Sequence, residues 1–210
     1  SDNYLASYLD HVRENVVLCG GTVYSSQKPA DPQKLLRWYY GTSREAVPAG
    51  KRNLKKGFII TSNNFLIEKR VFEQIRFREN IRDYGHEDTL LGYDLFMANV
   101  EICHICNPVE HSGLEDAEIF LMKTRTALKN LRFISEKMLA GDKVFTEKVH
   151  FLNRYRQIST IISPAILQLF FRLFSRKLER NLSGQNPCMF LFDLYKLGVY
   201  AELNKVQENT

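Results

Sequence analysis

The hydrophobic pattern of this 210-residue chain changes near Gly113, and that change limits what the chain can fold into. Before Gly113, short apolar runs of strand length alternate with short helical patterns and are separated by glycine and proline. After Gly113, apolar residues recur at the three- and four-residue spacing of amphipathic helices. We therefore predict an α/β region over residues 1–113 and an all-α extension over residues 114–210.

The first region predicts short elements. The apolar run Val16–Cys19 ends at a glycine pair and is typical of a buried strand, which residues 22–24 continue beyond a bulge. Further strands are predicted at residues 58–61, 65–67 and 100–106. Apolar residues at helical spacing predict helices at residues 3–14, 35–40, 68–75 and 87–99.

The second region predicts four longer helices. Ser163 followed by Pro164 is a strong helix start, because serine caps the free amide groups and proline fits the first turn. The four predicted helices cover residues 115–139, 145–162, 164–180 and 189–203.

Composition excludes several classes of protein. With 44% hydrophobic and 12% aromatic residues the chain is not intrinsically disordered. The net charge of +5 is small and comes entirely from residues 115–210, so nothing resembles the dense basic stripe of a nucleic-acid-binding protein. Four sparse cysteines argue against a disulfide scaffold, and we expect a cytoplasmic protein, in part at the inner face of the membrane.

The segments with chemical character are residues 57–72, 84–95 and 109–113. Gly85 allows the backbone to approach another group closely. Glu87 and Asp88 are adjacent carboxylates at the start of a predicted helix, where the helix dipole and free amide groups favour negative charge. Beside a loop rich in Asn and Ser they suit a ligand rich in hydroxyl groups, such as a sugar. The alternative is that both acids only stabilise the helix.

These segments carry a family resemblance. Thr61–Ile67, Tyr84–Leu95 and Glu110–Ser112 resemble the C-terminal half of the inverting family 2 glycosyltransferases with the GT-A fold, and the related galactosyltransferase C-terminal module. The resemblance covers about residues 1–113. It implies the acceptor-side half of a GT-A fold with a mixed sheet, followed by the helical extension.

The resemblance also implies roles for residues in its most specific block. Asp88 matches the catalytic base that takes the proton of the acceptor hydroxyl, and Glu87 matches the acceptor-binding carboxylate beside it. Gly85 and His86 belong to the same acceptor-binding block. His111 matches a histidine that helps to hold a divalent metal ion.

Three further residues are expected to bind the acceptor. Asn63 and Asn64 lie in the turn that borders the sugar site in the family. Trp38 falls in a variable region where related enzymes offer an aromatic ring to a sugar. For Trp38 and its aromatic neighbours Tyr39 and Tyr40, a partly buried cluster is the favoured alternative.

The implied reaction is the transfer of a sugar, with inversion, from a nucleotide-sugar donor to a glycan or lipid-linked acceptor, assisted by Mn²⁺ or Mg²⁺. Family members hold the metal with an Asp-x-Asp motif, which this chain does not contain. We therefore expect the donor half upstream of Ser1, and a chain that is inactive and binds metal weakly by itself. The alternative is a non-catalytic carbohydrate-binding or assembly module.

Two other clusters favour structural explanations. Cys103-His104-Ile105-Cys106 suggests zinc, but no second ligand pair at similar spacing accompanies it, so a strand with buried cysteines fits better. The basic residues within 51–56 could contact a diphosphate, although a solvated loop is the more common explanation.

The predicted helix 164–180 is apolar over most of its surface and ends in a basic group. Such a helix can lie on an anionic membrane surface. The favoured alternative is packing against the α/β region or against a second copy in a homodimer, because an appended helix needs a buried face.

Overall fold

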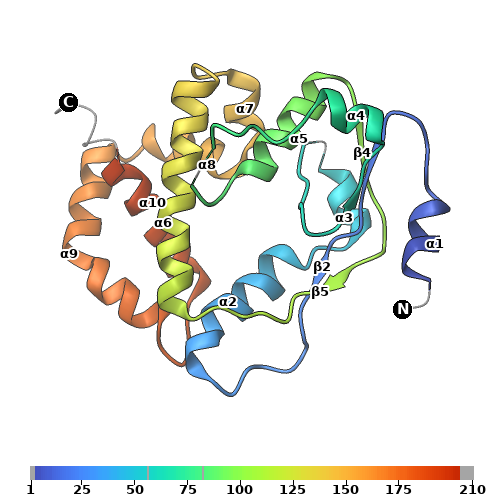
Figure 1. Cartoon of the computed structure of the whole chain (residues 1–210). Helices are drawn as coiled ribbons and strands as arrows, with labels where there is room; N and C mark the ends of the chain where they lie inside the picture. The colour runs from blue at the N-terminus through green and yellow to red at the C-terminus, as the bar shows by residue number, and fades with distance from the viewer. Residues whose placement is uncertain (1–2, 56, 82, 204–210) are drawn as a thin grey trace. The chain divides into compact units, whose positions relative to one another are not determined.

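The computed structural model describes residues 3–55, 57–81 and 83–203 (Figure 1). These residues divide into two units. The first unit takes in residues 3–27, 40–81 and 86–113, and the second takes in 28–39, 83–85 and 114–203. One boundary falls between Gly113 and Leu114, where the sequence pattern changes.

The first unit is built from short strands and helices. Its strands are β1 (Val16–Cys19), β2 (Thr22–Val23), β3 (Phe65–Leu66), β4 (Glu101–His104) and β5 (Val109–Glu110). Its helices are α1 (Tyr4–Leu9), the π-helical turn η2 (Gly41–Glu45), α3 (Ala49–Leu54), α4 (Lys69–Gln74) and α5 (Glu87–Met97).

A mixed three-stranded sheet forms the centre of this unit. Strand β1 lies in the middle, parallel to β4 and antiparallel to β3, with Leu18 opposite both Cys103 and Leu66. Strands β2 and β5 form a separate parallel pair, with Thr22 opposite Val109.

Both faces of β1 are buried, which explains its uninterrupted apolar sequence. Val17 and Cys19 pack into a core with Leu91 and Leu95 of α5. Leu18 points to the opposite face of the sheet, into a smaller cluster that includes Tyr8 of α1 and Ile105, which follows β4.

The second unit is helical in its described residues. Its elements are the 3₁₀ turn η1 (Pro32–Lys34), α2 (Leu35–Tyr40), α6 (Ala117–Phe133), the π-helical turn η3 (Ile134–Met138), α7 (Lys143–Lys148), α8 (His150–Ser159), α9 (Pro164–Leu182) and α10 (Met189–Leu203). Helix α10 packs against both α9 and α6, as Figure 1 shows.

The predicted combination of a mixed α/β region with a helical C-terminal region is confirmed. Within it, two predictions about strands were wrong. Residues 58–61 form no strand, although Phe58 and Ile60 are buried. Residues 22–23 do not extend β1 beyond a bulge, because they pair with β5 instead.

Several predicted helices have different bounds. The first helix ends at Leu9 rather than Glu14, and Leu9 and Val12 are exposed, so little packing favours a longer helix. The predicted helix 145–162 is divided at Val149, whose extended backbone (φ −76°, ψ 103°) separates α7 from α8. The solvated loop favoured for the basic residues within 51–56 was wrong for residues 51–54, because they belong to α3, and Lys56 lies outside the described residues.

No helix in the described residues is both long and apolar enough to cross a membrane alone. Helices α8 and α9 reach that length and composition only as a pair, and they are bent by 104° at the break between them.

Candidate functional site

The first turn of α5 holds the two predicted acidic residues. One oxygen of Asp88, Oδ2, accepts a hydrogen bond from the backbone N–H of Ser62 at 3.0 Å. Its other oxygen, Oδ1, is buried, and no group in the described residues donates a hydrogen bond to it. The protein therefore fixes one oxygen of this carboxylate and leaves the other buried oxygen unpaired.

Glu87 precedes Asp88 and shares this property. Its Oε2 atom is also buried without a hydrogen-bond partner among the residues described. Buried polar atoms usually have partners, because an unsatisfied buried group costs about 1–3 kcal/mol. Two unsatisfied carboxylate oxygens in one helical turn are therefore a feature that needs an explanation, such as a ligand.

His86 forms the N-cap of α5 with a left-handed backbone (φ 69°), which is uncommon outside glycine. Its Nδ1 lies 3.1 Å from Oγ1 of Thr89. Burial lowers the pKa of His86 to about 4, so the ring is neutral at pH 7. A neutral ring can accept or donate a hydrogen bond without adding charge beside Glu87 and Asp88.

The turn at residues 61–64 makes hydrogen bonds to both α5 and β2. Ser62 holds Asp88, as described above, and the side-chain amide of Asn63 donates to Oγ1 of Thr22 at 3.2 Å. Strand β2 in turn holds His111, because the N–H of His111 donates to the carbonyl of Val23 at 2.9 Å. A continuous set of contacts thus runs from Asp88 through the turn and β2 to His111.

Asn64 has a structural position in this turn. Its Oδ1 accepts from the hydroxyls of Tyr4 and Tyr8, both at 2.5 Å, and its Nδ2 donates to the carbonyls of Gly21 and Asn107 at 2.7 and 2.8 Å. The side chain is almost completely buried. All of its hydrogen-bonding positions are used inside the chain, so it orders the turn rather than offering an atom to a sugar.

His111 follows β5 and packs beside Tyr24, with ring centroids 5.2 Å apart. Its Nε2 is buried and unpaired within the described part of the chain. A metal ligand needs such a free nitrogen, but a divalent ion needs several ligands. No three His, Cys, Asp or Glu side chains in the described residues are placed to share a metal ion. These residues alone therefore do not fit a complete metal site.

Gly85 and Trp38 belong to the second unit. Gly85 has φ +102°, and a Cβ atom there would lie 2.5 Å from that of Ala127 on α6. The close approach that glycine permits is thus to α6 in this structure. Trp38 lies in α2 and packs edge-on against Tyr39, with ring centroids 5.0 Å apart, as the aromatic-cluster alternative predicts.

The basic segment supplies one residue with an unexpected place. The Arg52 guanidinium donates to four backbone carbonyls, those of Val47, Cys19, Gly20 and Ile105, at 3.0–3.3 Å. It therefore ties β1, β4 and α3 together and is not directed at a diphosphate. Only its position among other basic residues was visible in the sequence, and that pattern does not distinguish a partly buried arginine from a solvated lysine.

The Cys103–Cys106 segment is a strand only in its first half, and the predicted burial of its cysteines was wrong, because Cys103 is half-buried and Cys106 is exposed. Cys103 and His104 lie in β4, whereas Cys106 is exposed beyond its end. His104 Nδ1 contacts Arg52 Nη1 at 2.7 Å. Burial raises the pKa of the neighbouring strand's Cys19 to about 12, which keeps that thiol neutral. These environments favour the structural explanation over zinc.

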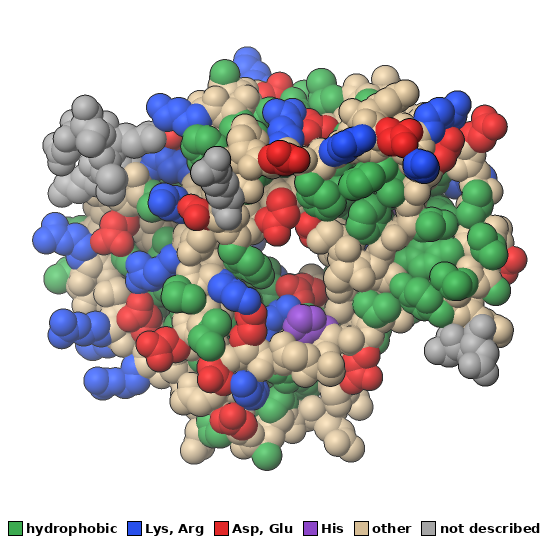
Figure 2. All heavy atoms as spheres, in the orientation of Figure 1, with side chains coloured by type: hydrophobic (Ala, Val, Ile, Leu, Met, Phe, Trp, Pro, Cys, Tyr) green, Lys and Arg blue, Asp and Glu red, His purple; other side chains and the backbone are tan. Residues whose placement is uncertain are grey.

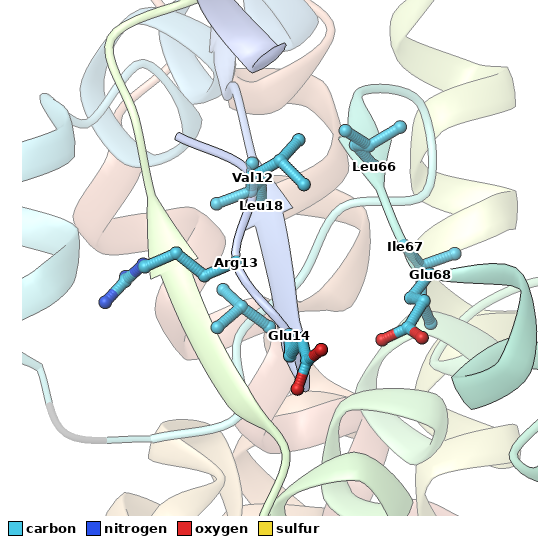
Figure 3. A pocket seen from close by; sticks show the side chains of 8 residues that line it. Val12, Arg13, Glu14, Leu18, Leu66, Ile67 and Glu68 are labelled. Atoms are coloured by element: carbon cyan, nitrogen blue, oxygen red, sulfur yellow. The ribbon is translucent and has the colours of Figure 1, made fainter. Parts of the chain in front are cut away.

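An apolar cavity of about 280 Å³ lies elsewhere in the first unit, over β1 and β3 (Figure 3). Val12, Leu18 and Leu66 line one end of it, and the carboxylates of Glu14 and Glu68 lie toward the other. None of the predicted site residues lines this cavity.

The first unit is thus a mixed α/β region in which buried, unpaired polar atoms lie at the start of α5 and at His111. Comparison with models of protein families, with curated protein sequences and with solved structures found no match to this chain. The glycosyltransferase resemblance therefore depends on the motif residues themselves and on where the structure places them.

Proposed function

We propose that this chain forms the acceptor-binding part of an inverting glycosyltransferase that uses a nucleotide-sugar donor. The observation that carries the proposal is the state of Asp88. One of its oxygens is held by the Ser62 N–H, and the other is buried with no partner in the described residues. A general base needs this combination of fixed orientation and one unpaired oxygen.

Asp88 Oδ1 would take the proton of an acceptor hydroxyl. The hydroxyl oxygen attacks the anomeric carbon, and the bond from that carbon to the departing nucleoside diphosphate breaks in the same displacement. Attack opposite the leaving group inverts the configuration. Glu87 Oε2 would accept a hydrogen bond from a second hydroxyl of the acceptor, which satisfies the other unpaired carboxylate oxygen of this turn.

The remaining neighbours would position these two carboxylates. Neutral His86 offers hydrogen bonding without competing as a cation. The order of the 61–64 turn, which Asn64 maintains through its four side-chain hydrogen bonds, sets the direction of the Ser62 N–H. Mn²⁺ or Mg²⁺ remains part of the proposal for the complete enzyme, and no step is assigned to it here because these residues do not complete its site.

Replacing Asp88 tests the proposed base. In the protein encoded by the complete native reading frame, Asp88→Asn removes the proton acceptor but keeps shape and the Ser62 contact. We expect turnover to fall by roughly 10²–10⁴-fold, with donor binding unchanged. Transfer is measured with a panel of nucleoside-diphosphate sugars and glycan acceptors, and donor binding by calorimetry.

Glu79→Gln is the matched control, because it removes an exposed carboxylate of the same unit. Undiminished transfer in the Asp88→Asn variant would show that another group is the base.

The second candidate, a non-catalytic carbohydrate-binding module, is favoured by one observation. The described residues provide two unpaired carboxylate oxygens but no complete metal site. In that case a glycan array detects binding that Glu87→Gln and Asp88→Asn weaken, while no donor supports transfer in the complete protein. Absence of both binding and transfer would contradict both candidates.

A further inference from the structure

Helix α9 has two faces of different character. Leu167, Phe171, Leu178 and Leu182 are buried, and α10 packs against this helix. Packing inside the chain therefore accounts for one face, although the partner is another helix of the same unit and not the α/β region that the sequence analysis favours. It leaves the opposite face without an explanation.

That opposite face is apolar in its first half. Ile166, Leu169 and Leu173 follow each other at three- and four-residue spacing, so they form a single ridge. Their exposed fractions are 58%, 56% and 66%. Ile161, just before the helix, is 85% exposed. Large aliphatic side chains so exposed on one ridge are typical of a surface that meets another apolar phase.

The same face is cationic in its second half. Arg172, Arg176, Lys177 and Arg180 are exposed. Among the described residues, the three arginines have no carboxylate partner, and Lys177 lies over the ring of Phe174. The one carboxylate of α9, Glu179, is paired with Arg125 at 2.9 Å. Figure 2 shows blue side chains along the edge where Figure 1 places α9.

We propose that the exposed face of α9 binds the surface of an anionic lipid bilayer. The ridge of Ile166, Leu169 and Leu173 would enter the boundary between headgroups and acyl chains, and the cations would contact lipid phosphates. Each Lys or Arg near such a surface strengthens binding about fivefold. The 104° bend between α8 and α9 suits a helix that lies in the interface, because a straight span would need the two helices aligned.

Charge favours lipid over a second copy of the chain. A symmetric contact through this face would bring the same four cations of each copy to one interface. No carboxylate on the face would compensate for them, since Glu179 is already paired. An anionic membrane matches this charge, and its apolar interior matches the ridge. The proposal does not depend on the glycosyltransferase proposal.

Vesicle sedimentation with the full chain tests the proposal. We expect binding to vesicles of phosphatidylcholine containing about one third phosphatidylglycerol, little binding to phosphatidylcholine alone, and weaker binding in high salt. Leu169→Glu combined with Leu173→Glu should lower the partition coefficient by more than about tenfold, because two leucines that would enter the bilayer are lost. Arg176→Gln with Lys177→Gln should lower it by roughly fivefold per charge.

Matched controls remove similar groups elsewhere. Leu5→Glu with Leu54→Glu changes two leucines that are 72% and 82% exposed, and Lys51→Gln with Lys55→Gln removes two exposed cations. These variants should bind nearly as the parent chain does. Circular dichroism confirms that every variant is folded.

Two results would overturn the proposal. One is equal binding of the α9 variants and the controls, which would mean that general charge attraction suffices. The other is failure to bind anionic vesicles together with a concentration-dependent dimer, seen by light scattering, that Leu169→Glu with Leu173→Glu dissociates. A second copy of the chain would then cover this face.

Discussion

Arg52 joins three segments of the first unit through one guanidinium. Its four carbonyl contacts are with Cys19 of β1, with Gly20 and Ile105, which follow β1 and β4, and with Val47, two residues before α3. Its fifth contact is with Nδ1 of His104. A charged side chain surrounded by carbonyl oxygens is well accommodated, but a second positive charge at His104 is not.

This contact makes the first unit sensitive to acid. Burial, together with the charge of Arg52, lowers the pKa of His104 to about 4, compared with about 6.5 in an unfolded chain. As the pH falls from about 6.5 to 4, the unfolded chain takes up a proton that the folded chain refuses. Stability contributed by neutral His104 is therefore complete above pH 6.5 and lost on the way down to pH 4.

We predict that His104→Gln reduces the loss of stability over this pH range. Glutamine keeps an acceptor for Arg52 but does not titrate, so the pH-dependent loss should shrink by on the order of 2 kcal/mol. Urea unfolding at a series of pH values between 7 and 4 measures it, and the exposed His11→Gln is the matched control. An unchanged pH profile would mean that His104 is protonated readily in the folded chain. Burial lowers the pKa of His86 in the same direction, so His86 contributes a further loss in this range.

At the residue scale, sequence patterns reveal local arrangements of residues but not the contacts that those residues make with distant parts of the chain. Glu87 and Asp88 were visible because adjacent acids at a helix start are a local pattern, and the structure leaves one buried oxygen of each unpaired. Asn64 belongs to the same motif, yet its amide is saturated by groups far away in the sequence. Long-range partners of this kind cannot be deduced from spacing. The same holds for Arg52.

Among the elements, glycine controls how closely two helices of the second unit approach. A Cβ atom at Gly198 in α10 would lie 2.4 Å from the Phe171 ring of α9. Gly50 in α3 is a useful contrast, because nothing lies within 4 Å of its added Cβ. Glycine lowers helix stability by about 1 kcal/mol relative to alanine. Whether a change to alanine stabilises the chain therefore depends on whether there is space for the added methyl group.

We predict opposite effects for the two substitutions. Gly50→Ala should stabilise the chain by about 0.5–1 kcal/mol through helix propensity. Gly198→Ala should destabilise it by about 1–2 kcal/mol, because the shift forced on Phe171 outweighs that gain. Urea unfolding compares both variants with the parent chain. Equal stabilisation by both would mean that α9 and α10 are packed more loosely than this contact requires.

The element boundaries show that a hydrophobic pattern reports which residues are buried but not which elements they form. Phe58 and Ile60 are buried while Ile59 is exposed, so residues 58–61 alternate as a strand does. The Phe58 carbonyl, however, faces Gly92 of α5, where an added Cβ would lie only 1.9 Å away. Alternation therefore reported burial of an extended segment, and no pattern in the sequence reports whether a neighbouring strand is present. The break at Val149 is similar, because Val149 is buried together with Phe145 and Leu152, at the spacing of one helix face, and this pattern does not show the break.

In the whole molecule, the two units are not successive along the chain. Residues 28–39 and 83–85 belong to the helical unit although they lie before Gly113. Within that unit, Lys34 pairs with Asp116 at 2.6 Å, and the Arg37 guanidinium lies over the Phe120 ring at 5.2 Å. The change in sequence pattern at Gly113 marks the start of long helices, and the helical unit extends beyond it.

We therefore predict that a fragment of residues 114–210 folds poorly by itself. Asn130 is 6% exposed, and its amide donates to the carbonyls of Asp83 and Gly85, at 2.6 and 3.2 Å, which the fragment lacks. Each unsatisfied buried group costs about 1–3 kcal/mol, and loss of the contacts of residues 34 and 37 adds to this. Since small domains are stable by only about 5–15 kcal/mol, the fragment should lose much of its cooperativity in urea unfolding followed by far-ultraviolet circular dichroism.

Asn130→Ala in the full chain isolates one part of the effect, and should destabilise the chain by about 1–3 kcal/mol. If the fragment instead unfolds cooperatively and as stably as the helical signal of the full chain, residues 28–39 and 83–85 only lie on the helical unit and contribute nothing to its stability.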